Sequence, residues 1–252
     1  MTMPTPPAGD GQHPVALVVI SANELAASSA FYSSVFGWQV MPMSAELSGA
    51  VARGGPAIAL RAGMPEGFPG IVPFLRVPNV PAALERVVAG GASVERAPWK
   101  IPGMGTLARF TDTSGTVYGL TDATVADGAP PVPMPFGDNP KPPAGTVCSL
   151  EMYSAGDNAP AFFGAHFGWG TLPTMPQFVA FDPGAGIAGV FQSHTPALPA
   201  VAYIYVDDVA ATLSAITGAG GAGQGDPMAM PGMGAFGYFK DPSGTLMGLI
   251  GR

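Results

Sequence analysis

The chain has 252 residues, of which 47% are hydrophobic and only 11% are charged. That length allows one large domain or two modules of ordinary size, with enough apolar material for a core. The net charge is −7, and the ten Lys and Arg residues are scattered along the sequence. Because they form no cluster, a nucleic-acid partner is not expected. The single cysteine, Cys148, excludes an intrachain disulfide and any zinc site built from several cysteines.

The N-terminal residues contain no basic segment followed by an apolar one, so a secretory signal is not predicted. Apolar runs such as VALVVI at residues 15–20 have the length of strands and are too short to span a bilayer. The sequence therefore predicts a cytoplasmic protein, with residues 1–13 as a disordered tail.

The predicted elements of the first half begin with a β-branched strand at residues 15–20. A helix follows from Asn23, with apolar residues near helical spacing, and Gly37 is typical of a helix end. Two short apolar runs about a Gly-Gly pair predict a hairpin. A further strand, a short helix with an early proline, and a hairpin with the turn D-T-S-G complete the half.

The second half repeats this order. AFYSSVFGW at residues 30–38 returns as AFFGAHFGW at residues 161–169, and IPGMGTLARFTDTSGTVYGL at 101–120 returns as MPGMGAFGYFKDPSGTLMGL at 230–249. A repeat of this length indicates one structural unit used twice. We therefore predict a first module at residues 14–126, a stiff proline-rich linker at 127–143, and a second module at 144–252.

The order of elements resembles the vicinal-oxygen-chelate superfamily, which holds glyoxalase I, bleomycin-resistance proteins and extradiol dioxygenases. The resemblance rests on a strand, then a helix that ends in the pattern F-Y-x-x-x-F-G-W, then a closing hairpin of the pattern D-P-x-G-x-x-x-G-L. It covers nearly the whole chain apart from the tail and the linker. It implies an α+β fold of two tandem βαβββ modules whose curved, mixed sheets form a cleft. The repeated aromatic residues are then interpreted as the packing of each helix on its sheet.

The resemblance also implies where metal ligands would stand. Metal-using members carry His or Glu on the first strand and just before the last Leu of the closing hairpin. The closing positions here are Gly119 and Gly248, and the first-strand position falls near Leu17, so none of them offers a ligand. The three histidines do not supply a 2-His-1-carboxylate pattern. No metal and no other cofactor is therefore expected.

Glu151 is the predicted catalytic candidate, in the strand CSLEMY that opens the second module. Alternation along a strand puts Ser149, Glu151 and Tyr153 on one face. A carboxylate in an apolar cleft is expected to have a raised pKa, which suits a general acid or base. The alternative is a structural hydrogen-bonding role. His194, on a loop before a strand, is the second catalytic candidate.

Ligand-binding residues are predicted around the same cleft. An inward glycine in place of glutamate is expected to leave volume for a bulky apolar group, and methionine adapts to such groups. The predicted set consists of two loop methionines, the two closing glycines and two aromatic residues: Met104, Gly119, Tyr153, Phe178, Met233 and Gly248.

Three functions remain open at this point. The first is a metal-independent protein that binds a small hydrophobic or aromatic metabolite, in antibiotic resistance or natural-product metabolism. The second is a metal-independent lyase, isomerase or tailoring enzyme that uses Glu151 as acid or base, assisted by His194 or Tyr153. The third is a metal-dependent glyoxalase or dioxygenase. No membrane partner is expected, and the linker permits either a monomer with intrachain pairing or a swapped homodimer.

Overall fold

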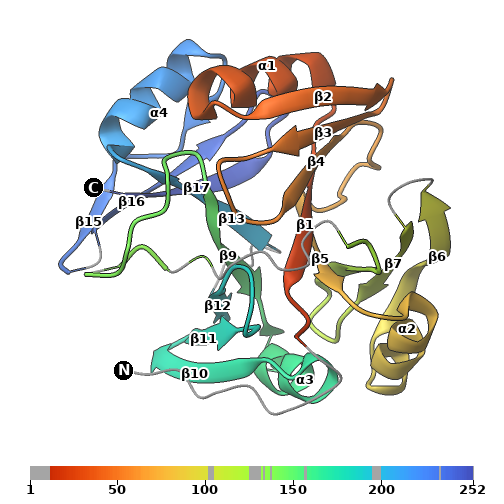
Figure 1. The fold of residues 1–252 in the computed structure, drawn as a ribbon. Helices are drawn as coiled ribbons and strands as arrows, with labels where there is room; N and C mark the ends of the chain where they lie inside the picture. The colour runs from red at the N-terminus through yellow and green to blue at the C-terminus, as the bar shows by residue number, and fades with distance from the viewer. Residues whose placement is uncertain are drawn as a thin grey trace. The chain divides into compact units, whose positions relative to one another are not determined.

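The computed structural model describes residues 12–101, 105–124, 132, 134–136, 138–155, 158–194, 200–232 and 234–251. The first repeat contains, in chain order, β1 (Val15–Ser21), α1 (Leu25–Phe36), β2 (Gln39–Ser44), β3 (Leu47–Val51), β4 (Ala57–Arg61), β5 (Ile71–Arg76), α2 (Val80–Ala89), β6 (Ser93–Ile101), β7 (Gly105–Thr111) and β8 (Val117–Thr121) (Figure 1). The second contains β9 (Val147–Tyr153), α3 (Asn158–Phe167), β10 (Gly170–Met175), β11 (Phe178–Asp182), β12 (Gly189–Gln192), β13 (Ala200–Val206), α4 (Val209–Gly218), β14 (Ala222–Gly223), β15 (Met228–Met230), β16 (Gly234–Lys240) and β17 (Leu246–Gly251).

The predicted α+β class with mixed sheets is confirmed. Each repeat contains the βαβββ order twice in succession, for example β1–α1–β2–β3–β4 followed by β5–α2–β6–β7–β8. Strands β2 and β6 were not predicted, because β2 has almost no buried residue and β6 is largely exposed, so neither carries the apolar alternation of a half-buried strand.

The strands of each repeat form one sheet. The first has the order β2-β3-β4-β1-β5-β8-β7-β6, and the second has β10-β11-β12-β9-β13-β17-β16-β14 with β15 beside β16. Parallel pairs lie at the centre, such as β5 with β8 and β12 with β9, and antiparallel hairpins lie toward the edges. Strand orders correspond between the sheets, as the repeat predicts.

The chain divides into two compact units that cut across the repeats, and the module boundaries stay a prediction. Unit 1 contains most of β5 with α2–β6–β7–β8, and most of β9 with α3–β10–β11–β12. Unit 2 contains most of β1 with α1–β2–β3–β4, and most of β13 with α4–β14–β15–β16–β17. Each unit therefore combines half of one repeat with half of the other.

The tryptophan of each aromatic phrase ties these halves together inside a unit. In unit 2, Trp38 donates its indole N–H to the Gly145 carbonyl at 2.8 Å. In unit 1, Trp169 donates to the His13 carbonyl at 2.9 Å. His13 is buried, and its Nδ1 lies 2.9 Å from the Arg76 carbonyl, which differs from the predicted disordered tail through residue 13.

Local sequence explains the helix ends. Gly37 follows α1 with φ 67°, a left-handed conformation that glycine adopts without steric cost. Asn79 caps α2 by accepting from the Ala82 N–H, and Asp208 caps α4 by accepting from the Ala211 N–H. None of the helices in the described ranges combines the length and apolar character needed to cross a membrane.

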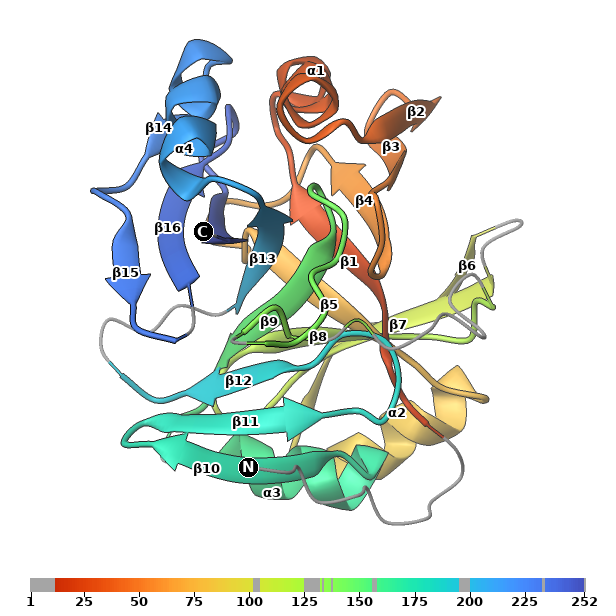
Figure 2. The ribbon, with the colours of Figure 1, turned by 60° about the vertical axis from the view of Figure 1, so that its left-hand side comes forward.

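The repeated aromatic phrases form core, as predicted. In unit 2, Tyr32 stacks on Trp38 with ring centroids 4.7 Å apart. In unit 1, Phe163 lies 4.7 Å from Trp169 and 4.9 Å from Tyr118 of β8. These rings are buried, so they act through packing. Helix α3 and strands β10, β11 and β12 lie side by side in unit 1 (Figures 1 and 2).

Candidate functional site

Three neighbouring strands of unit 1 bring several predicted site residues onto one face. Phe178 of β11 pairs with Gln192 of β12, and Gln192 pairs with Tyr153 of β9. Residues paired across strands point to the same side, and so do residues two positions along each strand. We call this surface the Glu151 face. Its two rows contain Phe178, Gln192 and Tyr153, then Ala180, Val190 and Glu151.

The other side of these strands packs on α3. Met152 pairs with Phe191, and the Phe191 ring lies 5.2 Å from Phe163 of α3. Because side chains alternate along β9, Glu151 points away from the helix. Its exposed fraction is only 5%, so the carboxylate is held in a buried environment on the Glu151 face.

His194 lies just beyond the end of β12 on the same side. Its ring centroid is 5.5 Å from that of Phe178, and its backbone N–H donates to the Gln192 side-chain oxygen at 3.1 Å. The buried Nδ1 of His194 has no hydrogen-bond partner within the described ranges. The structure therefore groups Glu151, Tyr153, Phe178 and His194, four of the predicted site residues, on or beside one face.

Sequence reasoning missed Gln192, which is fully buried and lies at the centre of this group. The stretch V-F-Q-S-H alternates, so strand periodicity places Val190, Gln192 and His194 on one side. That signal could have identified it. Tyr153 is held at its backbone, where its carbonyl accepts from the Thr116 hydroxyl at 3.4 Å.

The predicted open volume above the two closing glycines is wrong. A Cβ atom built at Gly119 would overlap the Phe74 ring at Cδ1, and one at Gly248 would overlap the Tyr203 ring at Cδ1. An aromatic ring from the neighbouring strand thus fills the space in each case. Whether the glycines contact a ligand stays a prediction, and Met104 and Met233 lie outside the described residues.

The chain was compared with known proteins. No protein-family model matches it. It is 28% identical over 251 residues to a Mycobacterium bovis protein named "Putative glyoxylase CFP32", covering 92% of each chain, and equally to the protein of that name from Mycobacterium tuberculosis.

Solved structures add the fold. The Mn(II)-bound glyoxalase from Novosphingobium aromaticivorans superposes with a TM-score of 0.64 at 17% identity, covering 95% of this chain and 81% of that one. The 2,3-dioxygenase LapB from Pseudomonas sp. KL28 gives 0.65 at 13% identity, covering 96% and 92%. The chain has the vicinal-oxygen-chelate fold. The resemblance seen in the sequence is thereby confirmed.

The vicinal-oxygen-chelate fold raises the question of a divalent metal. Leu17, Gly119 and Gly248 stand at three of the positions at which the resemblance implied ligands, and rings cover both glycines. Glu151 lies near the first-strand position of the second repeat. The described ranges contain no group of three or more His, Cys, Asp or Glu residues placed to hold an ion. The residues at positions 17, 119 and 248 therefore offer no side-chain ligand to a divalent metal.

Proposed function

We propose that this chain is a glyoxalase/bleomycin-resistance-like protein that binds a small hydrophobic or aromatic molecule on the Glu151 face of unit 1, without a protein-bound metal. The observation that carries the proposal is the register of β11, β12 and β9, which aligns Phe178, Gln192 and Tyr153. Two aromatic rings flanking an amide suit a molecule with an aromatic or apolar body and one polar group.

Each side chain has a definite part in such binding. Phe178 and Tyr153 offer ring surfaces, and the Gln192 amide is oriented by its bond to the His194 N–H. Glu151 is an acceptor when ionised, and its burial strengthens any hydrogen bond that it makes. The bound molecule would therefore present a donor group toward Glu151. A role in antibiotic resistance or natural-product metabolism follows if that molecule is sequestered unchanged.

Native mass spectrometry tests the proposal. The purified protein is measured before and after incubation with a small-molecule extract of its source, and the captured ligand is then titrated by calorimetry against the wild type and Tyr153→Ala. A retained, unchanged molecule whose affinity falls by about tenfold or more in the variant supports the proposal, since an aromatic contact contributes about 1 kcal/mol beyond burial. Equal affinity in Tyr153→Ala would place the ligand elsewhere.

A metal-independent enzyme is the second candidate. The observation that favours it is that Glu151 shares its face with Tyr153 and has His194 at the edge of that face, so three groups able to move protons lie on one side of the strands. Glu151 would accept a proton from the bound molecule, and Tyr153 or His194 would return one. A captured species that differs in mass from its precursor, with turnover lost in Glu151→Gln, would establish this function.

A further inference from the structure

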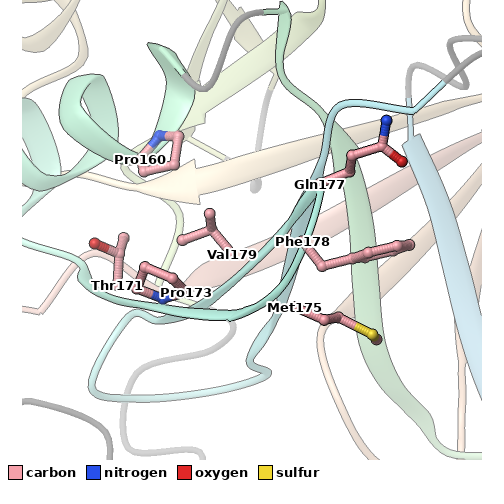
Figure 3. A pocket seen from close by; sticks show the side chains of 7 residues that line it. All are labelled: Pro160, Thr171, Pro173, Met175, Gln177, Phe178 and Val179. Carbon is pink, nitrogen blue, oxygen red and sulfur yellow. The ribbon is translucent and has the colours of Figure 1, made fainter.

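A cavity lies at the hairpin end of strands β10 and β11. It has a volume of about 320 Å³ and lies beside the β10–β11 hairpin and the first turn of α3 (Figure 3). We call it the hairpin pocket. Its lining consists of Pro160, Thr171, Pro173, Met175, Gln177, Phe178 and Val179.

Part of the hairpin pocket lies on the α3 side of these strands, opposite the Glu151 face. Pro173 pairs with Val179, and Val179 pairs with Phe191, whose ring belongs to the α3 side of the strands. In Figure 3 the Val179 side chain points toward Pro160 of α3, whereas Phe178 points away from both. Phe178 belongs to both surfaces, and Met175, which pairs with it, points to the same side.

The internal repeat provides a comparison for this pocket. The hairpin β2–β3 has the same register and the same irregularity as β10–β11, 131 residues earlier. At the matching positions three apolar side chains are replaced by serine: Ser29, Ser44 and Ser48 stand for Pro160, Met175 and Val179. The first hairpin is therefore more polar at these three positions, whereas Val40, Pro42 and Leu47 stand for Thr171, Pro173 and Phe178.

Gln177 gives a second, independent observation. It has φ 68°, and it is the one non-glycine residue with a positive φ in the described ranges. A side chain in this region is conformationally costly, and such positions concentrate at ligand sites. Its counterpart Glu46 instead lies 3.9 Å from Arg61, so the first hairpin uses this position for an ion pair.

We propose that the hairpin pocket is a second binding site, for a small neutral molecule that combines an aromatic ring with a carboxamide. None of the seven lining residues is charged, which favours a neutral ligand over an ion. Proline rings and the Met175 thioether pack well on an aromatic face. The Gln177 amide offers both a donor and an acceptor, which complements a carboxamide. The volume is at the small end for ligand pockets, so one or two rings fit.

Benzamide is the probe, and methionine methyl groups are the reporters. Met175 is 47% exposed in the pocket, and Met41 and Met43 are 55% and 52% exposed on β2 of the matching hairpin. In a methyl-labelled NMR titration we expect a saturable shift at Met175 and none at the other two. Benzoate should bind at least about tenfold more weakly, because its charge has no partner in the lining.

Two variants separate binding from folding. Val179→Ser installs the residue of the first hairpin and should weaken benzamide at least about fivefold through lost apolar contact. Gln177→Gly should weaken it about fivefold through the lost amide, yet leave the melting temperature unchanged or higher because the backbone cost is relieved. Met43→Ser is the matched control and should not alter binding. Non-saturable shifts, equal shifts at Met41 and Met43, or full binding in both pocket variants would overturn the proposal and leave the Glu151 face untouched.

Discussion

The Phe74 ring lies against the backbone of Gly119, because the two residues pair across the parallel strands β5 and β8. The same relationship joins Tyr203 to Gly248 on β13 and β17 in unit 2, where the Tyr203 hydroxyl also lies 2.7 Å from that of Tyr238. The glycines are therefore required by the close packing of a ring against each of them.

Gly119→Ala should lower the free energy of unfolding by about 1–3 kcal/mol, because the new methyl group overlaps the buried Phe74 ring and forces it to move. Urea denaturation of the purified variant measures the change. Gly164→Ala in α3 is the control, since a Cβ there meets only the Trp169 carbonyl at 3.6 Å. Alanine in a helix should leave stability unchanged or raise it.

If the Phe74 ring packs on Gly119, the effects of substitutions at these two residues on the free energy of unfolding should not be additive. Phe74→Ala alone should cost about 3–5 kcal/mol through the cavity that it leaves. In the double variant the methyl group added at position 119 enters part of that cavity, so the combined loss should be smaller than the two single losses added together. Strict additivity would contradict the contact between ring and glycine.

Tyr32→Phe should destabilise unit 2 by about 1–3 kcal/mol, measured by denaturation at pH 7. The Tyr32 hydroxyl donates to Oδ2 of buried Asp241 at 3.2 Å, and Ser28 donates to the same oxygen at 3.3 Å. Oδ1 accepts from the backbone N–H groups of Ser243 and Thr245. Removal of the Tyr32 hydroxyl leaves Asp241 Oδ2 with the Ser28 hydroxyl as its donor. If Tyr32→Phe lowers the free energy of unfolding less than Ser28→Ala does, Tyr32 is not the main donor to this oxygen.

The repeat predicts the opposite change at Phe163. Asp112 matches Asp241, and its Oδ1 also accepts two backbone N–H groups, but its buried Oδ2 has no partner in the described part of the chain. The counterparts of Ser28 and Tyr32 are Ala159 and Phe163. Phe163→Tyr should therefore stabilise the protein by about 1 kcal/mol in the same assay, and no gain would show that the new hydroxyl does not reach Oδ2.

Asp112 should make stability depend on pH. Burial raises the pKa of Asp112 to about 6 from its ordinary 3.8, although backbone N–H groups led by that of Thr116 oppose the rise. The folded state thus binds this proton more tightly than the unfolded chain. Protonated Asp112 therefore contributes up to about 3 kcal/mol to the free energy of unfolding. This contribution is fully present below about pH 4 and is lost as pH rises through 6.

Asp112→Asn tests this sign. The Asn side-chain oxygen can still accept both backbone N–H groups, and the amide has no proton to release as pH rises. The stability of the variant relative to wild type should rise between pH 4 and pH 7, measured by urea denaturation at each pH. The exposed Asp226→Asn variant is the control. A constant difference between Asp112→Asn and wild type would show that Asp112 does not titrate in this range.

Much of the fold was predictable because the repeat doubles every local signal. The signals that end α1 at Gly37 and begin α2 at Asn79 act within a few residues, and so do the aromatic phrases. The sequence alone therefore locates these helices. The face of Glu151 followed from alternation along one strand. These are short-range properties, and a single sequence contains them.

What could not be predicted depends on long-range pairing. The ring over Gly119 comes from Phe74, 45 residues earlier, and only the β5–β8 register brings them together. The combination of half-repeats in each unit also depends on distant contacts, such as Trp38 with Gly145. The hairpin pocket arises from residues that each read as ordinary surface positions, and it becomes visible only when α3 and the hairpin are placed together.

Metal removal gives the most direct test of the proposed chemistry. The protein is dialysed against a chelator, its metal content is measured by elemental mass spectrometry, and the captured ligand is titrated before and after. We expect affinity to change by less than about twofold, because the positions at issue hold Leu17, Gly119 and Gly248 and none of these binds a divalent ion through its side chain. Loss of binding that Mn(II) restores would establish a metal-dependent site and overturn the proposal. Retained binding together with loss in Tyr153→Ala would instead assign recognition to the Glu151 face itself.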